Sequence, residues 1–506
     1  MTSNRSFLDR AIEYVSPALG ARRAYARYAI ETAYQAARML RIGSGSTVSN
    51  AGPNAEVLSA ASMLRARARD QIRNTGFGKN AKRQWGTRLW STGMMPVWQS
   101  GKIRNARLAQ LWAQWSRTCW GNGPSEAGSR WEQAGLHMVN GAFESGEVLA
   151  LRRKHTNSEK RHLGLTFDLI EPDHLDDSKD GQVFQDGSYV RGGIEFSERG
   201  IRRAYYLYDL HPGESELRVH SLRSKRVEAS EVVHLFEPDR PGATRGVPHS
   251  SAVADQSHNL ASYLQYDIQQ KKVAACFAAF VTRPDADALP IGTETGKVGE
   301  GQRGERIQPA MIHYLANGES VQIAAPAQAG GVEQTSLVML REIAAGYHIP
   351  YEILTGDWSK TNYSSSRSGL IGFADYVNQY RWLVLRPALD GLVWWFLEAA
   401  YALGALDVAP EQIKWEWTEP EFRLLDRLNE AQADELELNL GTLTWAQAVA
   451  AKGYDPEAQA AEVARWKQAR EQAALTNHDA GRVHSEQNGT DKGKADPPTE
   501  SDSRSQ

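Results

Sequence analysis

The stretch that decides the fold runs from residue 248 to residue 284 and reads PHSSAVADQSHNLASYLQYDIQQKKVAACFAAFVTRP. A proline and two serines are typical of a helix start, and the Arg283-Pro284 pair marks its end. Leu260, Leu264 and Ile268 recur every four residues, and alanines near the end leave a thin face that permits close helix packing. The pattern predicts one long helix over residues 248–282.

A polar module rich in glycine and proline follows this helix over residues 285–331. It carries strand signals at 311–314 and 321–323, which predict a small β module. A short amphipathic helix is expected over residues 337–347, and the chain then enters a polar stretch at 355–368.

The chain before the long helix has a different pattern. Short alternating or β-rich runs at 165–170, 204–208 and 232–236 predict a mainly β or α+β region. A basic helix is expected over 57–74, and seven tryptophans lie between Trp85 and Trp131. Tryptophans interleaved with arginine could stack on bases, but filling a core or a subunit interface is the favoured interpretation.

The chain after the polar stretch is helical by pattern. Residues 370–403 read as an aromatic-rich helix broken or kinked at Pro387, because proline lacks an N–H donor and clashes with the preceding turn. A last helical block is expected over 421–468, interrupted at Gly441. Beyond residue 476 almost no apolar residues remain, which predicts disorder.

Composition limits the possible classes of protein. A chain of 506 residues can hold more than one core. Its formal net charge of −3 lacks the basic excess of a dedicated nucleic-acid binder. No apolar run approaches the roughly 20 residues that span a bilayer, so we expect a soluble chain made in the cytoplasm, with no membrane contact.

Motifs for an active site fail on inspection. The glycines of 299–304 fit a dinucleotide fingerprint only formally, because no apolar strand precedes them and Pro309 follows. Asp176, Ser178, Asp180 and Gly181 imitate the front of a calcium loop, but position twelve is a glycine, which favours an exposed turn. Neither a zinc-type His-Glu-x-x-His pair nor a nucleophile elbow is present. We expect no catalytic residue, no cofactor and no metal.

Several stretches are informative when they are read together and in order. They are 65–74, 86–96, 168–175, 193–195 with 204–205, 234–236, 240–242, 245–248, 349–357 and 362–367. Jointly they resemble the lambda-type family of tailed-bacteriophage portal proteins, which has a short strand at the place of 86–96. The resemblance covers roughly residues 20–470 and departs from the family pattern at Ser366, where alanine is usual, and near Asp426.

The resemblance implies an α+β portal fold with named parts. It would comprise a basic N-terminal arm (1–51), a mixed α/β wing (52–247), helices of a stem (248–282 and 334–347), a small β-containing clip (283–333), a tunnel loop (348–367), a long kinked helix (368–405), a helical crown (406–475) and a disordered tail (476–506).

The resemblance also implies a structural role without enzymatic activity. Such proteins form a ring of twelve subunits at one capsid vertex, the channel for DNA packaging and ejection. The implied partners are further copies of the chain, the terminase large subunit, the major capsid or scaffolding protein, head-completion proteins, and double-stranded DNA passing without sequence specificity. The implied location is the virion, with the host cytoplasm during assembly.

A channel that passes any sequence should make few and short-lived phosphate contacts. The tunnel-loop candidates are Lys360, Asn362, Tyr363, Ser364 and Arg367, and Lys271 and Lys272 are candidates in the stem. Each has another interpretation. Asn362 and the serines could cap a helix beginning near Ser368, the lysine pair could be a solvated face, and Arg367 could form an intersubunit salt bridge.

Two other functions stay open at this point. A different ring or adaptor protein of the virion would have a similar composition. A metal-dependent packaging enzyme would need clustered acidic residues, or a nucleophile with its base, and the sequence displays neither motif.

Overall fold

The computed structural model describes residues 51–125, 128–155, 162–214, 223–275, 279–282, 320–323, 331–420, 427–452, 454 and 459–472. The chain divides into two compact units, one over Met1–Gly93 with Ser100–Ile413 and the other over Met94–Gln99 with Lys414–Gln506. Residues 1–50 of the basic arm and the tail 476–506 lie outside the described residues, so what the sequence predicts for them stays a prediction.

Four helices begin the first unit: α3 (Pro53–Asn74), α4 (Gly76–Leu89), α5 (Lys102–Trp115) and α6 (Trp131–Ser145). The helix α3 confirms the basic helix predicted over 57–74 and begins four residues earlier. Pro53 occupies its first turn, where a missing N–H costs nothing. Val57, Leu64 and Ile72 are buried along one face, so packing holds the helix in place although its other face is basic.

The tryptophans between Trp85 and Trp131 fill cores. All seven are exposed by 7% or less. The rings of Trp112 and Trp115 lie 5.1 Å apart, and each contacts the ring of Phe396 from a distant helix. The core-filling interpretation is therefore confirmed, and the buried rings are closed to stacking on bases.

Two antiparallel sheets follow the helices. The first has the order β3-β2-β8, and the second is a meander β4-β5-β6-β7. The strands β3, β6 and β8 confirm the three β-rich runs. Side chains from both sheets share one core, which includes Leu149, Ile194 and Tyr205. The strands are β2 (Glu147–Lys154), β3 (Leu165–Ile170), β4 (Tyr189–Arg191), β5 (Ile194–Phe196), β6 (Arg202–Tyr208), β7 (Ser224–Glu228) and β8 (Val232–Phe236).

Short one-turn helices connect several of these elements. They lie at His162–Gly164, Pro172–His174, Asp177–Lys179, Ala229–Glu231, His249–Ala252 (η8) and Pro410–Gln412.

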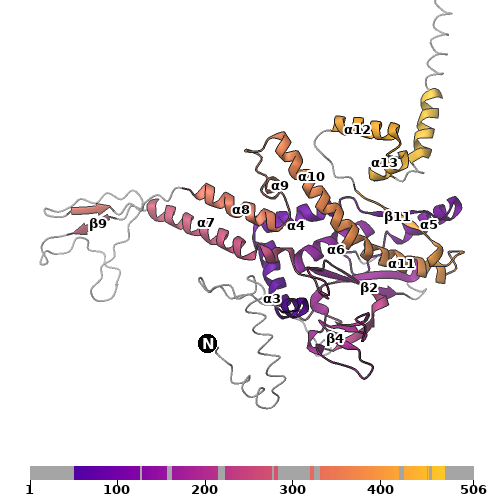
Figure 1. Cartoon of the computed structure of the whole chain (residues 1–506), viewed down its shortest axis with the longest axis horizontal. Helices are drawn as coiled ribbons and strands as arrows, with labels where there is room; N and C mark the ends of the chain where they lie inside the picture. The colour runs from indigo at the N-terminus through magenta and orange to yellow at the C-terminus, as the bar shows by residue number, and fades with distance from the viewer. Residues whose placement is uncertain are drawn as a thin grey trace, which may run out of the picture. The chain divides into compact units, whose positions relative to one another are not determined.

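Two helices of the first unit lie side by side, α7 (Ala254–Ala275) and α8 (Val332–Gly346) (Figure 1). Beyond them the chain forms an antiparallel pair of strands, β9 (Ala279–Thr282) and β10 (Ser320–Ile323). The strand β10 confirms the signal at 321–323. The signal at 311–314 lies outside the described residues, as does most of the predicted clip.

The long helix was predicted to reach residue 282, and this is wrong. The helix α7 ends at Ala275, and residues 279–282 form a strand whose Val281 pairs with Val321. Alanines favour helix locally, but Phe280, Val281 and Thr282 are aromatic or β-branched and favour a strand once a partner is available. The strand β9 therefore lies in a segment that was predicted to be helical, and it pairs with a strand of the predicted clip segment 283–333.

A break or kink was predicted at Pro387, and the structure has a change of helix type just before it instead. After the short helix α9 (Tyr351–Thr355), a long helical element consists of α10 (Tyr363–Tyr380), a π-helical turn at Arg381–Leu385 (η9) and α11 (Arg386–Ala402). The N–H of Arg386 donates to the carbonyl of Arg381, five residues back. Pro387 has no N–H to continue the α-helical ladder, so the chain takes a wider turn just before it.

In the second unit, β1 (Met95–Trp98) pairs with β11 (Trp415–Thr418), and α12 (Arg427–Leu440) precedes α13 (Trp445–Ala451). Gly441, with φ of 74°, ends α12 and confirms the predicted interruption. The strand that the resemblance implied over residues 86–96 is wrong for residues 86–89, because these belong to the helix α4, which continues to Leu89. Within the described ranges, no helix is both long and apolar enough to cross a membrane.

Candidate functional site

The polar stretch between α9 and α10 is a compact turn over residues 356–362. Gly356 adopts a φ of 75° and ends α9. Asp357 organises the next residues, since its carboxylate accepts the N–H of Ser359 at 3.1 Å and the hydroxyl of Tyr351 at 3.1 Å. The hydrogen bonds from Ser359 and Tyr351 hold the pKa of Asp357 below its ordinary value.

The helix after this turn starts earlier than predicted. Asn362 is its N-cap: the side-chain oxygen accepts the N–H of Ser365 at 2.8 Å, and the Ser365 hydroxyl oxygen accepts the N–H of Asn362 at 3.3 Å. This capping box begins α10 at Tyr363 rather than near Ser368. The tunnel loop was predicted to reach residue 367, so Tyr363, Ser364 and Arg367 belong to a helix instead, and the capping role of Asn362 is confirmed.

The two basic candidates near this turn differ in their partners. The Lys360 ammonium lies 3.0 Å from a carboxylate oxygen of Glu333 on α8, and the two side chains are 64% and 77% exposed. Arg367 is exposed, and no hydrogen bond or ion pair joins it to another residue of the described ranges. Ser364 is also exposed. The structure thus presents two cations on a surface that also carries Glu333 and Asp357.

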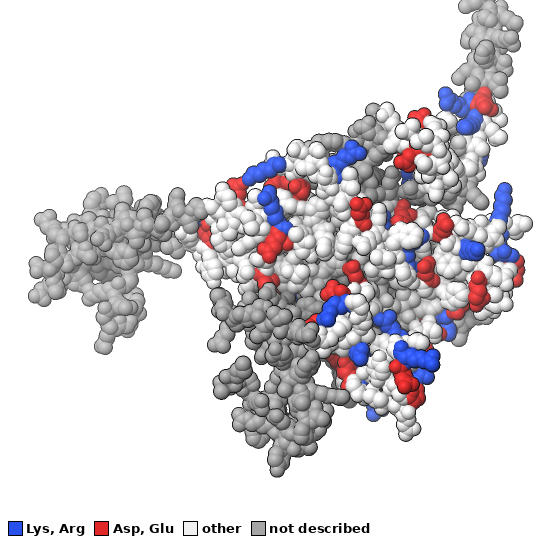
Figure 2. Space-filling view, in the orientation of Figure 1, with Lys and Arg blue, Asp and Glu red and all other residues white. Residues whose placement is uncertain are grey.

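The stem candidates are ordinary surface lysines. Lys271 forms an ion pair of 2.8 Å with Asp267, one helical turn away, and Lys272 is exposed. On the face shown in Figure 2, basic and acidic side chains are interspersed. A mixed surface of this kind attracts phosphates only weakly.

A buried polar cluster in the first unit consists of Glu147, His234 and Arg245, whose side chains are exposed by 4% or less. Arg245 Nη2 lies 2.6 Å from one Glu147 oxygen, and His234 Nε2 lies 2.9 Å from the other. The Gly246 N–H also donates to Glu147, at 3.2 Å. Burial opposes ionisation of Glu147, but Arg245 and His234 outweigh it and hold the pKa of this carboxyl well below its ordinary value.

The backbone at this cluster crosses closely. A side-chain carbon added at Gly246 would lie 2.1 Å from the carbonyl oxygen of Gly146, closer than atoms can approach. The residues of the stretch 245–248 therefore have physical roles. Arg245 neutralises Glu147, and Gly246 permits the two backbone segments to cross closely. Sequence reasoning noted this motif but missed its partner, because Glu147 lies 98 residues earlier.

One group of possible metal ligands comes together, in Glu171, Asp173 and His211. The guanidinium of Arg69 already donates to Glu171 at 2.8 Å and to Asp173, while Arg65 lies 3.1 Å from Asp173. Two cations thus satisfy the carboxylates, and these ion pairs tie α3 to the segment 171–173 after β3.

The turn that imitates a calcium loop is only partly exposed. Residues 177–178 and 180–186 are exposed, as expected for a surface turn. Asp176 alone is buried at its start, where it accepts hydrogen bonds from the hydroxyl groups of Ser178, Tyr208 and Ser224. The Asp180 carboxylate accepts the N–H of Gly193 at 3.0 Å. Both carboxylates therefore hold the turn itself in shape.

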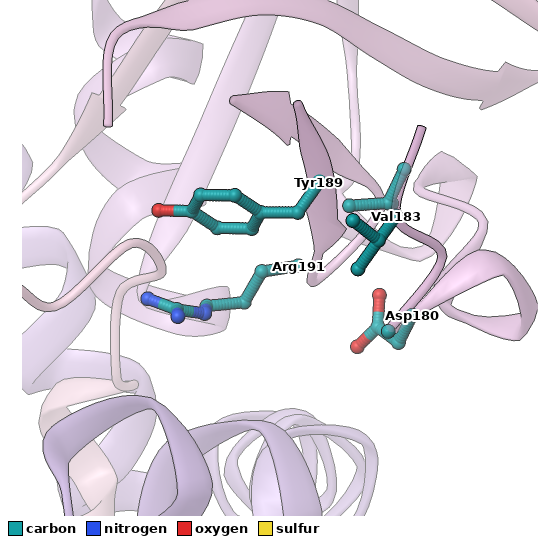
Figure 3. Close-up of a pocket in the computed structure, with 6 residues that line it drawn as sticks. Asp180, Val183, Tyr189 and Arg191 are labelled. Carbon is teal, nitrogen blue, oxygen red and sulfur yellow. The ribbon is translucent and has the colours of Figure 1, made fainter. Parts of the chain in front are cut away.

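A pocket of about 280 Å³ lies beside this turn, against the strand β4 (Figure 3). In the close-up, the side chains of Tyr189 and Arg191 run alongside each other, and the Arg191 guanidinium lies 5.1 Å from the centre of the Tyr189 ring. Burial raises the pKa of Asp180, which lines the opposite side. At this size the pocket is small for a substrate site, since such sites span about 300–1,000 Å³.

A second pocket, of about 300 Å³, lies where η8, α8 and α10 meet. His249 lines it and stacks on Phe143 at 4.9 Å. Burial, with the nearby His348, lowers the pKa of His249 to about 4, so this side chain is neutral at pH 7. Glu237 also lines the pocket, and burial raises its pKa.

Comparison with known proteins identifies the class to which this architecture belongs. Residues 41–381 match the family model "phage portal protein, lambda family", which is more than half of the chain. The chain belongs to the lambda family of phage portal proteins. Its function is accordingly that of a capsid portal, and the family is structural rather than catalytic.

Individual relatives are distant. The probable portal protein of Halomonas phage phiHAP-1 is 23% identical over 383 residues, which cover 71% of this chain and 72% of that protein. Portal protein B of Escherichia phage lambda is 23% identical over 290 residues, 53% of this chain and 52% of that protein. The chain therefore spans about half the length of the lambda protein.

Among solved structures, a chain from the neck of an empty GTA particle is similar with a TM-score of 0.45 and 15% identity. The match covers 78% of this chain and 94% of that chain.

Proposed function

We propose that twelve copies of this chain close into a ring at one capsid vertex and that double-stranded DNA passes through the ring during packaging and ejection. Membership of the portal family supports this proposal. The terminase large subunit docks on the ring while DNA enters, and head-completion proteins replace it afterwards. Assembly takes place in the host cytoplasm, and the mature ring is part of the virion.

The observation that carries the DNA-contact part is the exposed pair Lys360 and Arg367, on either side of the N-cap Asn362. Cations of this kind bind phosphates without reading bases, as a channel for any sequence requires. The pair between Lys360 and Glu333 is exposed, and such pairs contribute only about 0–1 kcal/mol. A passing phosphate can therefore replace the carboxylate and be replaced in turn.

The remaining candidates have lesser roles in this proposal. Asn362 positions the start of α10 and acts on DNA only through the helix. Ser364 and Tyr363 lie in the first turn, where unpaired backbone N–H groups favour a phosphate. Lys271 and Lys272 are weaker candidates, because Lys271 already has Asp267 as a partner.

The test is the double variant Lys360→Ala with Arg367→Ala, supplied to a phage that lacks its own portal gene. We expect normal rings but less packaged DNA or poorer genome retention. The matched control is Lys154→Ala with Arg107→Ala. Lys154 is 66% exposed and pairs with Glu231 at 2.9 Å, much as Lys360 pairs with Glu333, and Arg107 is also exposed. Packaging that is unchanged in the Lys360 and Arg367 variant rejects the DNA-contact assignment.

The basic arm is the proposed contact for the major capsid or scaffolding protein. Residues 1–88 are basic, unlike the acidic stretch 411–437. Deleting residues 1–41 should lower head assembly while rings still form. Normal head yield from the deleted chain counts against this contact.

Micrographs of the purified protein separate the proposal from its alternatives. We expect rings with a central hole. A persistent monomer with metal-dependent nuclease or protease activity would favour a packaging enzyme instead.

A further inference from the structure

The π-helical turn Arg381–Leu385 presents an unusual pair of side chains to solvent. Trp382 is 60% exposed and Leu383 is 68% exposed, whereas the neighbouring Arg381 and Leu385 are buried. In this turn the charged residue points inward and the apolar residues point outward. A local π turn inside a longer helix is frequently associated with a functional site.

The orientation of the turn is fixed by the buried arginine. Arg381 Nε donates to the carbonyl of Leu89 at 3.0 Å, and Nη2 donates to the carbonyl of Arg88 at 2.7 Å. These carbonyls lie at the end of α4, where a helix has unpaired acceptors and favours a cation. Because Arg381 is held there, Trp382 and Leu383 cannot rotate into the core.

The exposed surface continues along α10. The inner face of this helix is buried through Phe373, Val377 and Tyr380. The outer face carries Ile371, which is 43% exposed, and Gly372, which has open space around it. We call the outer surface formed by Ile371, Gly372, Asp375, Gln379, Trp382 and Leu383 the α10 outer face.

We propose that the α10 outer face is the surface on which a neighbouring copy of this chain docks, with Trp382 at the centre of the contact. This inference rests on the ring proposed above. In a closed ring every copy presents two different surfaces to its two neighbours, so each copy must carry a surface that is covered only after assembly.

The chemistry of the face favours a protein neighbour over DNA. It carries one carboxylate, Asp375, and one cation, since the Arg386 guanidinium lies 3.7 Å from the centre of the Trp382 ring. The two charges balance, so the face has no excess of positive charge to attract phosphates. Aromatic and apolar residues with few charges are typical of the centre of a protein interface. A buried tryptophan contributes about 150–250 Å², a large share of the roughly 800 Å² that each partner buries in a stable interface.

The test measures ring assembly of the full-length chain against concentration, by mass photometry and light scattering. Trp382→Ala should raise the concentration for half-assembly by about tenfold or more, as expected for a central aromatic contact. Leu383→Glu should do the same, because it places a charge in the contact, and Trp382→Phe should restore most of the assembly. The matched control Trp445→Ala removes a tryptophan that is 46% exposed in α13 and should assemble like the wild type.

Thermal unfolding of each variant below its assembly concentration gives the second readout. We expect unchanged melting temperatures, since the changed side chains are exposed in the single chain. Wild-type assembly of Trp382→Ala overturns the docking surface. A lower melting temperature of the monomer overturns it too, because another part of the same chain then covers Trp382. The docking surface is also overturned if the Trp382→Ala variant assembles normally and loses only its binding to purified capsid protein. A wild-type chain that never forms rings overturns the proposed ring itself.

Discussion

Replacing Arg245 by methionine should destabilise the first unit by about 3–5 kcal/mol, the range for removing one partner of a buried ion pair. The change leaves Glu147 fully buried with only His234 and the Gly246 N–H as partners. Methionine keeps much of the side-chain volume, so the effect reports the lost guanidinium rather than a cavity.

Protonation of Glu147 limits the size of this effect. At pH 7 the variant can neutralise the stranded carboxylate, whose ordinary pKa is 4.5. Taking up that proton about 2.5 pH units above the ordinary value costs about 3.4 kcal/mol, at about 1.36 kcal/mol per unit. The lost hydrogen bonds to Glu147 and to the carbonyl of Gly192 add about 1 kcal/mol.

The stabilities of the wild type and of the Arg245→Met variant should therefore depend differently on pH. In the wild type the pKa of Glu147 is held below its ordinary value, so its contribution to stability is present above pH 4.5 and is lost below it. In the variant, burial without Arg245 raises that pKa, so acidification from pH 7 towards pH 5 restores stability. The difference between the two chains should narrow by about 2–3 kcal/mol over this interval.

Urea unfolding followed by tryptophan fluorescence at pH 7 and pH 5 measures these differences. The matched variant carries Glu147→Leu together with Arg245→Met. It should lose clearly less stability than Arg245→Met alone, because no charge is left buried. The reasoning is refuted if Arg245→Met costs under about 1 kcal/mol at pH 7, or if its deficit is the same at both pH values.

Three further changes test other parts of the fold by the same unfolding assay. Gly246→Ala should cost more than about 3 kcal/mol or abolish soluble expression, since its new side-chain carbon would meet the carbonyl of Gly146. The control Gly369→Ala, in open space on α10, should stabilise the chain by up to about 1 kcal/mol. Equal effects of the two substitutions would contradict the close backbone crossing. In the wild type, the pKa of buried His249 is about 4, whereas the unfolded chain accepts the proton near pH 6.5, so stability should fall by up to about 3 kcal/mol as the pH drops from 6.5 to 4. His249→Phe should remove this loss of stability. An unchanged pH profile would contradict this. Arg381→Met should cost about 2–3 kcal/mol by leaving the end of α4 unpaired, and a loss under about 0.5 kcal/mol would show that water replaces the guanidinium.

Much of the fold could be predicted because it depends on local patterns. The helix α3 has a continuous apolar face, β3 and β8 are short β-rich runs, and Gly441 interrupts a helical block where a positive φ is needed. Such signals are contained within a few residues, so one sequence is enough to find them.

Other features depend on residues far apart in the chain. The end of α7 at Ala275 was missed because the strand after it is stabilised by pairing with Ser320–Ile323, some forty residues later. Likewise, Glu147 looks like any glutamate at the start of a strand until Arg245 is placed against it. Neither contact has a local signature.

The candidate site was predicted in part. The polar turn and the basic residues Lys360 and Arg367 are exposed as a DNA contact would require. The start of α10 was placed too late, although Asn362 and Ser365 have the spacing of a capping box and could have located it. The ion pair between Lys360 and Glu333 could not be foreseen, because it joins the turn 356–362 to the helix α8, and the sequence does not specify how these two segments pack.

The most direct test of the account is a cryo-EM reconstruction of the purified ring at side-chain resolution. We expect residues 356–362 and Arg367 to face the central hole and Trp382 to be covered by the neighbouring subunit. A ring in which residues 356–362 lie on the outer rim, away from the hole, would contradict it.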